Sequence, residues 1–324
     1  MAVNGTGTVW NLPNYAGELF TASYTDTPLL SMIGGLTGGK VTNDFEFATG
    51  VLYDYPEASQ PAISETASLT APAATAIARR QEKNVTQIFH EVIDLSYVKQ
   101  SNMGRLSGLN SAGQQANPAD EKAWQIQRRL VKIARDVEYT FLNGAYALAA
   151  NSGEANKTRG MIELCKSEAG TNINAAGGAL SEKLIKELTR MMADNGAAFG
   201  NVVLFANSYQ KQAISEVFQK QLGFQLPASR NVGGLAIHEF ETDFCKLGVV
   251  WNKFMPADTI LVADVAHIAP VFQVVPDKGV LFEEPLAKTG ASDRIQIFGQ
   301  IGLDHAPAFL HGCIYGLATE AVGA

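Results

Sequence analysis

The hydrophobic and polar positions form their most regular pattern between residues 118 and 142, where they predict one long amphipathic helix. Asn117 is a suitable N-cap, and Pro118 is favoured at the first position of a helix. Apolar residues recur at spacings of three and four along one face, namely Ala123, Ile126, Leu130, Ala134, Val137 and Phe141. The opposite face carries Gln125, Arg128, Arg129, Lys132 and Arg135. The helix would be about 37 Å long, so we expect it to form a structural spine.

The second half of the chain alternates between helix and strand patterns. Ser181 is placed to cap a helix that ends near Asp194, and a strand at 202–206 precedes a second helix at 209–219. Further strands are predicted at 235–240, 247–251, 259–262, 271–275, 294–301 and 310–317. No internal repeat is visible, so the pattern predicts the α+β fold class.

Residues 1–40 have little periodicity and are interpreted as an N-terminal arm. A Thr27-Pro28 break precedes one short apolar run, and glycine pairs follow at 34–35 and 38–39. Terminal segments of this kind are ordered only when something holds them, so we expect the arm to pack on a partner.

Between the arm and the spine, the pattern predicts a long hairpin. Its two sides are strand patterns at 41–47, with Phe45 and Phe47 on one face, and at 85–97. The stretch 56–78 between them is too poor in large apolar residues to build a core of its own. So long a connection is either disordered or functional, and we interpret it as an arm that leaves the body and lies on a neighbouring subunit.

Composition indicates that much of the surface is covered by partners. Charged residues make up 18% of the 324, whereas an average soluble chain has about a quarter. Together with 30 glycines, this predicts neutral faces of the kind that subunits hide in an assembly. The net charge of −7 argues against a surface built to bind nucleic-acid phosphates. Because the chain opens at Met1 without a signal peptide or a long apolar run, we expect it to be made in the cytoplasm and not to span a membrane.

The residue types that carry chemistry do not form a recognisable site. Residues 34–41 match the GxxxxGK pattern of a phosphate-binding loop, but Val41 stands where the magnesium-binding Ser or Thr belongs. The five histidines lack metal-ligand spacing; Asp304-His305 and His311 could converge across a hairpin, and we interpret them as structural. The three cysteines are interpreted as small hydrophobic residues. We therefore predict no enzyme activity, no cofactor and no metal.

The densest basic run lies at 79–83, at the end of the proposed arm. It is either a solvated stretch or the partner of an acidic patch on a neighbouring subunit. On the second interpretation, the predicted inter-subunit contact residues are Phe45, Phe47, Arg79, Arg80, Glu82 and Lys83.

The order of arm, hairpin, spine and α+β body resembles that of the major capsid proteins of tailed bacteriophages. These proteins have the Johnson fold, which encapsulins and herpesvirus capsid floor domains share. In the first half the resemblance is carried by 15–19 (YAGEL), 27–35 (TPLLSMIGG), 45–47 (FEF), 84–89 (NVTQIF), 127–128 (QR), 135–138 (RDVE) and 158–161 (TRGM). In the second half it is carried by 210–214 (QKQAI), 242–244 (TDF), 252–256 (NKFMP) and 286–290 (LAKTG). Each stretch is weak by itself, but their order and spacing cover nearly the whole chain.

The resemblance implies a division of the chain into domains. Residues 1–40 would be the N-terminal arm and 41–100 the extended loop. The peripheral domain would combine 101–175, including the spine at 118–142, with 265–324. The axial domain, 176–264, would face the centre of each hexamer or pentamer. Since no long charged leader precedes the arm, the resemblance implies a separate scaffolding protein.

The function that the resemblance implies is that of a major capsid protein. Copies of the chain would assemble into hexamers and pentamers of an icosahedral head, which encloses double-stranded DNA without sequence-specific binding. The implied partners are a scaffolding protein, a portal and decoration or cement proteins, with assembly in the host cytoplasm and a final location in the virion. One alternative is an encapsulin-like shell protein, against which the phage-like arm stretches argue. The other is a cytoplasmic α+β enzyme, which would be a small oligomer with a defined pocket.

Overall fold

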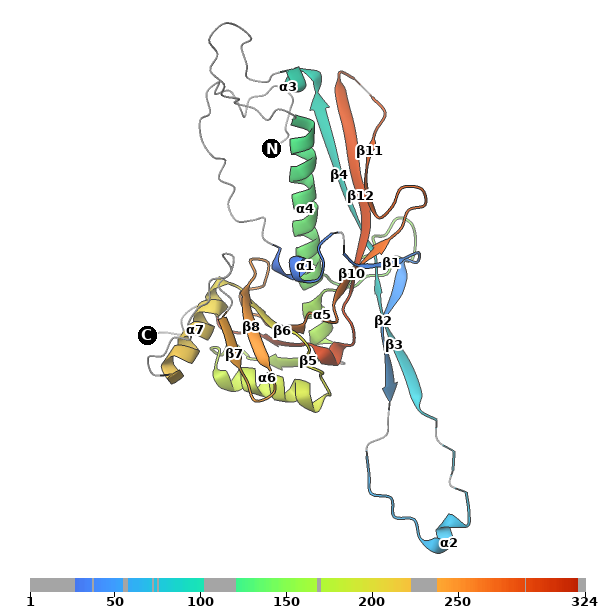
Figure 1. The fold of residues 1–324 in the computed structure, drawn as a ribbon, viewed down its shortest axis with the longest axis vertical. Coiled ribbons are helices and arrows are strands. Elements are labelled where there is room, and N and C mark those ends of the chain that lie inside the picture. The colour runs from blue at the N-terminus through green and yellow to red at the C-terminus, as the bar shows by residue number, and fades with distance from the viewer. Residues whose placement is uncertain are drawn as a thin grey trace.

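The computed structural model describes residues 27–36, 38–54, 58–71, 73–74, 76–101, 121–167, 170–222, 238–288 and 290–319. Within these ranges, a long helix and two β-sheets form the body, and a two-stranded hairpin projects from it (Figure 1). This mixture of helices and strands agrees with the predicted α+β class. No helix in the described ranges is both long and apolar enough to cross a bilayer.

The predicted spine is helix α4 (Glu121–Asn143). The predicted start at Pro118 lies outside the described residues. Val137 and Phe141 of the predicted apolar stripe are buried, and so are Ile133 and Leu142, which the stripe did not include. On another side, Arg129 donates to Glu91 at 2.9 Å and Lys132 pairs with the same carboxylate. Part of the basic face is therefore fastened to a neighbouring strand.

The five-stranded sheet is built around the long strand β12 (Ser292–Asp304). Strand β4 (Gln87–Ser96) lies antiparallel along one edge of β12. On the other edge, β11 (Leu281–Pro285) and β10 (Ala269–Gln273) pair with successive parts of the same strand. Strand β1 (Lys40–Thr42) adds parallel to β10, and α4 packs against the sheet through β4 and β12.

The six-stranded sheet has the order β5-β13-β9-β6-β8-β7. In that order its strands are Thr171–Asn174, Gly312–Tyr315, Ile260–Asp264, Val202–Ala206, Lys246–Trp251 and His238–Glu241. One face forms a core with α6 (Glu182–Asp194) and α7 (Ser208–Leu222), and the other shares the main core with α4 and α5 (Met161–Lys166). Ser181 caps α6 as predicted, by accepting the Leu184 N–H at 3.4 Å.

The strands of the second half agree with the prediction to within a few residues, with two additions. The expected residues 235–237 lie outside the described ranges. Strands β5 and β11 were not predicted, because one is short and polar and the other contains two glutamates and a proline. Both β5 and β13 belong to the six-stranded sheet, so that sheet combines residues from the predicted peripheral and axial ranges.

The predicted single strand at 41–47 is wrong. Strand β1 ends at Thr42, and β2 (Glu46–Asp54) begins after a turn and belongs to a different sheet. The far side of the hairpin is β3 (Ala78–Val85), whereas most of the predicted strand at 85–97 is β4, in the body. The hairpin thus spans residues 46–85, a shorter range than the predicted loop at 41–100. An alternating pattern shows which face of a strand is buried, but it does not show which other strand is hydrogen-bonded to it.

The prediction that residues 27–36 belong to an irregular arm is also wrong. They contain helix α1 (Pro28–Met32), and both Leu29 and Leu30 are buried in the main core. A five-residue helix is too short to display a helical period in the sequence. The remainder of the predicted arm, residues 1–26, lies outside the described residues.

Candidate functional site

The hairpin formed by β2 and β3 extends away from both sheets (Figure 1). Its strands pair from Glu46 and Val85 at the root to Asp54 and Ala78, beyond which the connection continues to the tip. The tip carries the single-turn helix α2 (Glu65–Ser68), which Ser64 caps by accepting the Ala67 N–H at 3.2 Å. A side-chain cap of this kind gives the tip local structure without a core.

Large apolar side chains are exposed along the hairpin. Leu69 is 84% exposed and Ile63 is 68% exposed at the tip. The other members of this exposed set are Phe45, Val51, Tyr53 and Ile77, each at least half exposed. Side chains scattered singly over a surface are ordinary, but a group on one projection indicates a surface that another chain covers.

The six predicted contact residues divide into two groups. Phe45, Arg79, Arg80 and Lys83 are exposed, and Lys83 pairs with Glu46 across the hairpin at 2.9 Å. Phe47 and Glu82 instead contact the body of their own chain. The Phe47 ring lies over Gly302, where a Cβ atom would come within 2.8 Å of it, and Glu82 accepts the Ala308 N–H at 3.2 Å.

Asn84 fastens the root of the hairpin to two other segments. Its side chain is completely buried, and Nδ2 donates to the carbonyl oxygens of Leu303 (2.8 Å) and Arg159 (3.2 Å). Its Oδ1 accepts the N–H groups of Arg159 (2.7 Å) and Val85 (2.9 Å). One amide thus fills its full hydrogen-bonding capacity. Thr158 adds a further link between these segments by accepting the Leu303 N–H at 3.2 Å.

A turn after β12 supports the hairpin from the side. Ala306 has a φ of +55°, a left-handed conformation that is uncommon outside glycine, and its N–H donates to Asp304 at 3.2 Å. The turn brings Pro307 against Gly50, where an added Cβ would meet Pro307 Cγ at 3.0 Å. Gly50 adjoins a bulge in β2, so any larger residue there would push the strand away from the turn.

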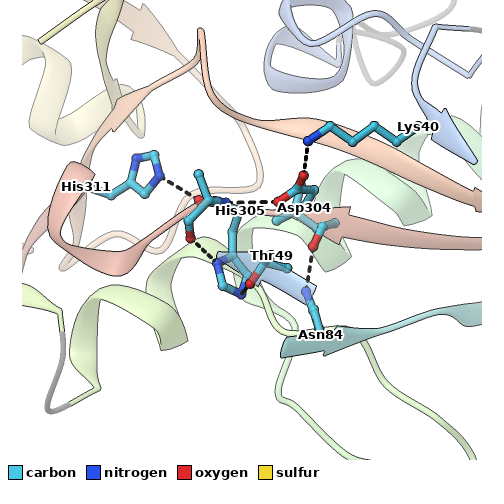
Figure 2. A network of polar contacts seen from close by, with 8 residues as sticks. Lys40, Thr49, Asn84, Asp304, His305 and His311 are labelled. Atoms are coloured by element: carbon cyan, nitrogen blue, oxygen red, sulfur yellow. Dashed lines mark hydrogen bonds and ion pairs between the residues drawn. The ribbon is translucent and has the colours of Figure 1, made fainter. Parts of the chain in front are cut away.

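Two buried histidines continue this network (Figure 2). His305 Nδ1 donates to the Ala306 carbonyl at 2.6 Å, which leaves Nε2 to accept from the Thr49 hydroxyl at 3.5 Å. His311 Nε2 donates to the His305 carbonyl at 2.7 Å, and its Nδ1 accepts the Asp264 N–H at 3.1 Å. Burial lowers the pKa of both histidines to about 4, so both rings are neutral at pH 7.

Asp304 carries the charge in this network. It forms an ion pair with Lys40 of β1, as Figure 2 shows. The residues Asp304, His305 and His311 thus converge, as the sequence allowed, and their partners are backbone groups, the Thr49 hydroxyl and Lys40. Among the described residues, no group of three His, Cys, Asp or Glu side chains could hold a metal ion. The arrangement is suited to holding the hairpin in one orientation.

The glycine-rich stretch and the three cysteines have structural roles. Gly34 and Gly35 both have positive φ and form the turn between α1 and β1. Since a strand follows this turn, the GxxxxGK stretch lacks the helix of a phosphate-binding loop. Cys165 and Cys313 are buried and Cys245 is half-buried, which agrees with their interpretation as small hydrophobic residues.

Sequence reasoning did not identify Asn84 and Thr158 as functional positions. Both lie in stretches that carry the resemblance to capsid proteins, 84–89 and 158–161, which the fold brings into contact. The only signal in the sequence was therefore family likeness, because a lone Asn or Thr in a strand or loop has no pattern of its own.

The comparisons with known proteins agree on a capsid fold. The family model described as SU10 major capsid protein matches residues 2–318. No curated protein sequence matches the chain significantly. Among solved structures, the cyanophage A-1(L) capsid is similar over 96% of this chain and 97% of that one, with a TM-score of 0.64 and 10% identity.

Two further solved structures show the same likeness. The capsid of the native GTA particle has a TM-score of 0.57 and 16% identity, covering 98% of this chain and 99% of that chain. The SrpI encapsulin of Synechococcus elongatus PCC 7942 has a TM-score of 0.59 and 12% identity, covering 96% and 95%. At these identities the likeness shows the fold, which is the predicted Johnson fold.

Replacing Asn84 with Ala should lower the free energy of unfolding by about 2–4 kcal/mol, because the variant leaves buried backbone groups of Arg159 and Leu303 without partners. Urea unfolding of the isolated subunit measures the loss. Gln81→Ala is the matched control, since Gln81 is exposed on the same strand and should change stability by less than about 0.5 kcal/mol. Equal effects in the two variants would contradict the role of Asn84.

The two buried histidines should lower the free energy of unfolding as the pH falls from about 6.5 to about 4. The two buried histidines have a pKa of about 4 in the folded chain against 6.5 normally, so the unfolded chain binds more protons in this window. Each histidine adds a slope of up to about 1.4 kcal/mol per pH unit. Urea unfolding at a series of pH values measures that slope. His311→Gln should reduce it, whereas the exposed His90→Gln should not; an unchanged slope in His311→Gln would refute the prediction.

Proposed function

Because the chain belongs to the SU10 major capsid protein family, we propose that its extended hairpin is the part that fastens one subunit to the next in the shell. The protein is a structural capsid protein of a tailed phage and assembles with copies of itself into the virion. The proposal concerns which of its surfaces make the contacts between subunits.

The observation that carries this proposal is the set of apolar side chains exposed on the hairpin. Ile63 and Leu69 at the tip are left uncovered by the described body, although burial of each would stabilise a contact by about 1.5–3 kcal/mol. Because the root contacts set one direction for the hairpin, the same tip meets the same surface in each copy. A contact between two different surfaces of identical chains generates rings when its rotation closes.

The basic residues of β3 supply the second part of the proposed contact. Arg79 and Arg80 are exposed on the hairpin, and the chain as a whole carries a net charge of −7. A neighbouring copy therefore carries more acidic than basic side chains, so an acidic patch on it is the proposed partner of these two residues. Complementary charge sets the register and speeds the encounter of two copies more than it adds affinity. Lys83 lies on the same projection and Phe45 directly before it, and both belong to the proposed contact, while Phe47 and Glu82 support it from the root.

Membership in the same family is also the basis for the roles that we propose for the other elements. Rings of six and five subunits would close the head around double-stranded DNA, which the shell encloses without reading its sequence. The six-stranded sheet with α6 and α7 is the proposed axial part, and α4 with the five-stranded sheet is the proposed peripheral part. A separate scaffolding protein, a portal and decoration or cement proteins are the proposed partners, with assembly in the host cytoplasm. An encapsulin-like shell is the alternative, and membership in a capsid family favours the phage head.

Replacing Ile63 and Leu69 together with Asp should reduce the yield of closed shells at least tenfold, because each charge would be buried in the contact. The isolated subunit should keep its stability to within about 0.5 kcal/mol, since both side chains are exposed in it. Electron micrographs and light scattering measure the shells. Leu148→Asp, at a half-exposed position outside the hairpin, is the control and should assemble normally. Normal shells from the double variant would rule out the tip as a contact.

Reversing the charge of Arg79 and Arg80 with Glu should also reduce shell yield, and the loss should shrink at high salt because the contact is electrostatic. The control carries the same change of charge at Lys183 and Arg190, which are exposed on α6. Sedimentation of assembly mixtures at two ionic strengths measures both variants. If the β3 variant and the α6 variant assemble equally well, the basic run is a solvated stretch.

A further inference from the structure

Three distant parts of the chain meet at the carboxylate of Glu138. This residue lies in α4 and is completely buried. Its Oε2 accepts the Leu30 N–H at 2.7 Å, and its Oε1 accepts both the Leu29 N–H at 3.0 Å and Asn252 Nδ2 at 2.5 Å. The carboxylate therefore joins the N-terminal helix α1, the spine and the loop that follows β8.

For α1, Glu138 takes the place of a helix cap. The preceding residue, Thr27, makes no side-chain capping bond, and Pro28 has no N–H to offer. The N–H groups of Leu29 and Leu30 have no partner within so short a helix, and Glu138 accepts both. A five-residue helix is not stable by itself, so α1 exists because its two leucines are buried and its first turn is capped from α4.

Asn252 connects the same carboxylate to the six-stranded sheet. Its N–H donates to the Ala206 carbonyl of β6 at 2.9 Å, and its Oδ1 accepts the Phe254 N–H at 2.9 Å. These bonds fix the amide in place, so its reach to Glu138 depends on the position of the sheet.

We propose that Glu138 is a latch that couples the docking of the N-terminal segment, residues 27–33, to the position of the six-stranded sheet. When α1 leaves, the buried carboxylate loses the N–H donors of Leu29 and Leu30 and keeps the Asn252 amide. When the sheet shifts and withdraws Asn252, the carboxylate holds α1 less well. An incompletely paired buried charge is costly, so each contact strengthens the other.

The connection after α1 permits such a release without unfolding the body. Gly34 and Gly35 adopt positive φ and separate α1 from β1, which stays paired to β10. Glycine takes many backbone conformations at little steric cost, so this turn can absorb a change in the direction of residues 27–33. The glycine-rich stretch 34–39, which does not fit a phosphate-binding loop, thus has the proposed role of a flexible connection between α1 and β1.

Hydrogen exchange on the full-length chain tests the latch. Asn252→Ala, which leaves the carboxylate in place, should lower the protection of amides 29–33 about fivefold to tenfold. Glu138→Gln should lower it more than tenfold, since its amide presents a donor to at least one N–H. The double variant should be no less protected than Glu138→Gln alone, because Asn252 acts through the carboxylate. Asp136→Asn on the exposed side of α4 is the control and should stay within twofold of the unchanged chain.

The coupling must also work in the opposite direction. Leu30→Ala weakens the docking of α1 without touching Glu138, and it should lower the protection of amides 252–255 several-fold, because coupling between two sites is reciprocal. The latch is refuted if Asn252→Ala leaves residues 29–33 as protected as before, or if the effects of the two single variants multiply. It is refuted equally if Asn252→Ala lowers protection uniformly through both cores, which would indicate global destabilisation. If Glu138→Gln does not fold, the Asn252→Ala and Leu30→Ala results decide.

Discussion

The direction of the extended hairpin depends on a buried amide at its root. Asn84 donates to two carbonyl groups and accepts from two N–H groups, and these belong to β12, to the segment after α4 and to the hairpin itself. Hydrogen bonds have strict angular requirements, so an amide with all its partners in place defines an orientation in a way that apolar contact does not. Every exposed side chain further along the hairpin takes its position from this root.

Close packing and directed polar contacts both support the surroundings of the root. Phe47 packs over Gly302, Pro307 abuts Gly50, and the two histidines are held neutral by burial. Neutral rings can accept on one nitrogen and donate on the other, so His311 joins two backbone segments and His305 joins the turn to the Thr49 hydroxyl without a second buried charge. Glu138 performs a comparable task, because a single carboxylate joins α1, α4 and the loop after β8.

Much of the fold could be predicted because its signals are local. The stripe from Ala123 to Phe141 has a helical period, and Ser181 stands before a helix that it caps. The errors arose at strands, because the local pattern does not show which other strand each one pairs with. The alternation at 41–47 runs across the end of one strand and the start of another, and the pattern at 85–97 fits a body strand as well as a hairpin strand. Of the predicted contact residues, Phe47 contacts its own chain because it lies over Gly302 of β12, and Glu82 because the turn after β12 reaches it.

The sequence by itself determined the spine, the α+β class, the low charge of the surfaces and the membership of a capsid family, since each depends on composition or on the order of short segments. The tertiary structure decided which strands pair, which hairpin residues face outward, and which polar groups are buried together. Asn84 bonds to residues 75 and 219 positions away, and Glu138 bonds to residues more than 100 positions away. The identity of one residue does not specify so distant a partner. The partner is selected during folding, because each polar group that becomes buried in the core must form hydrogen bonds there.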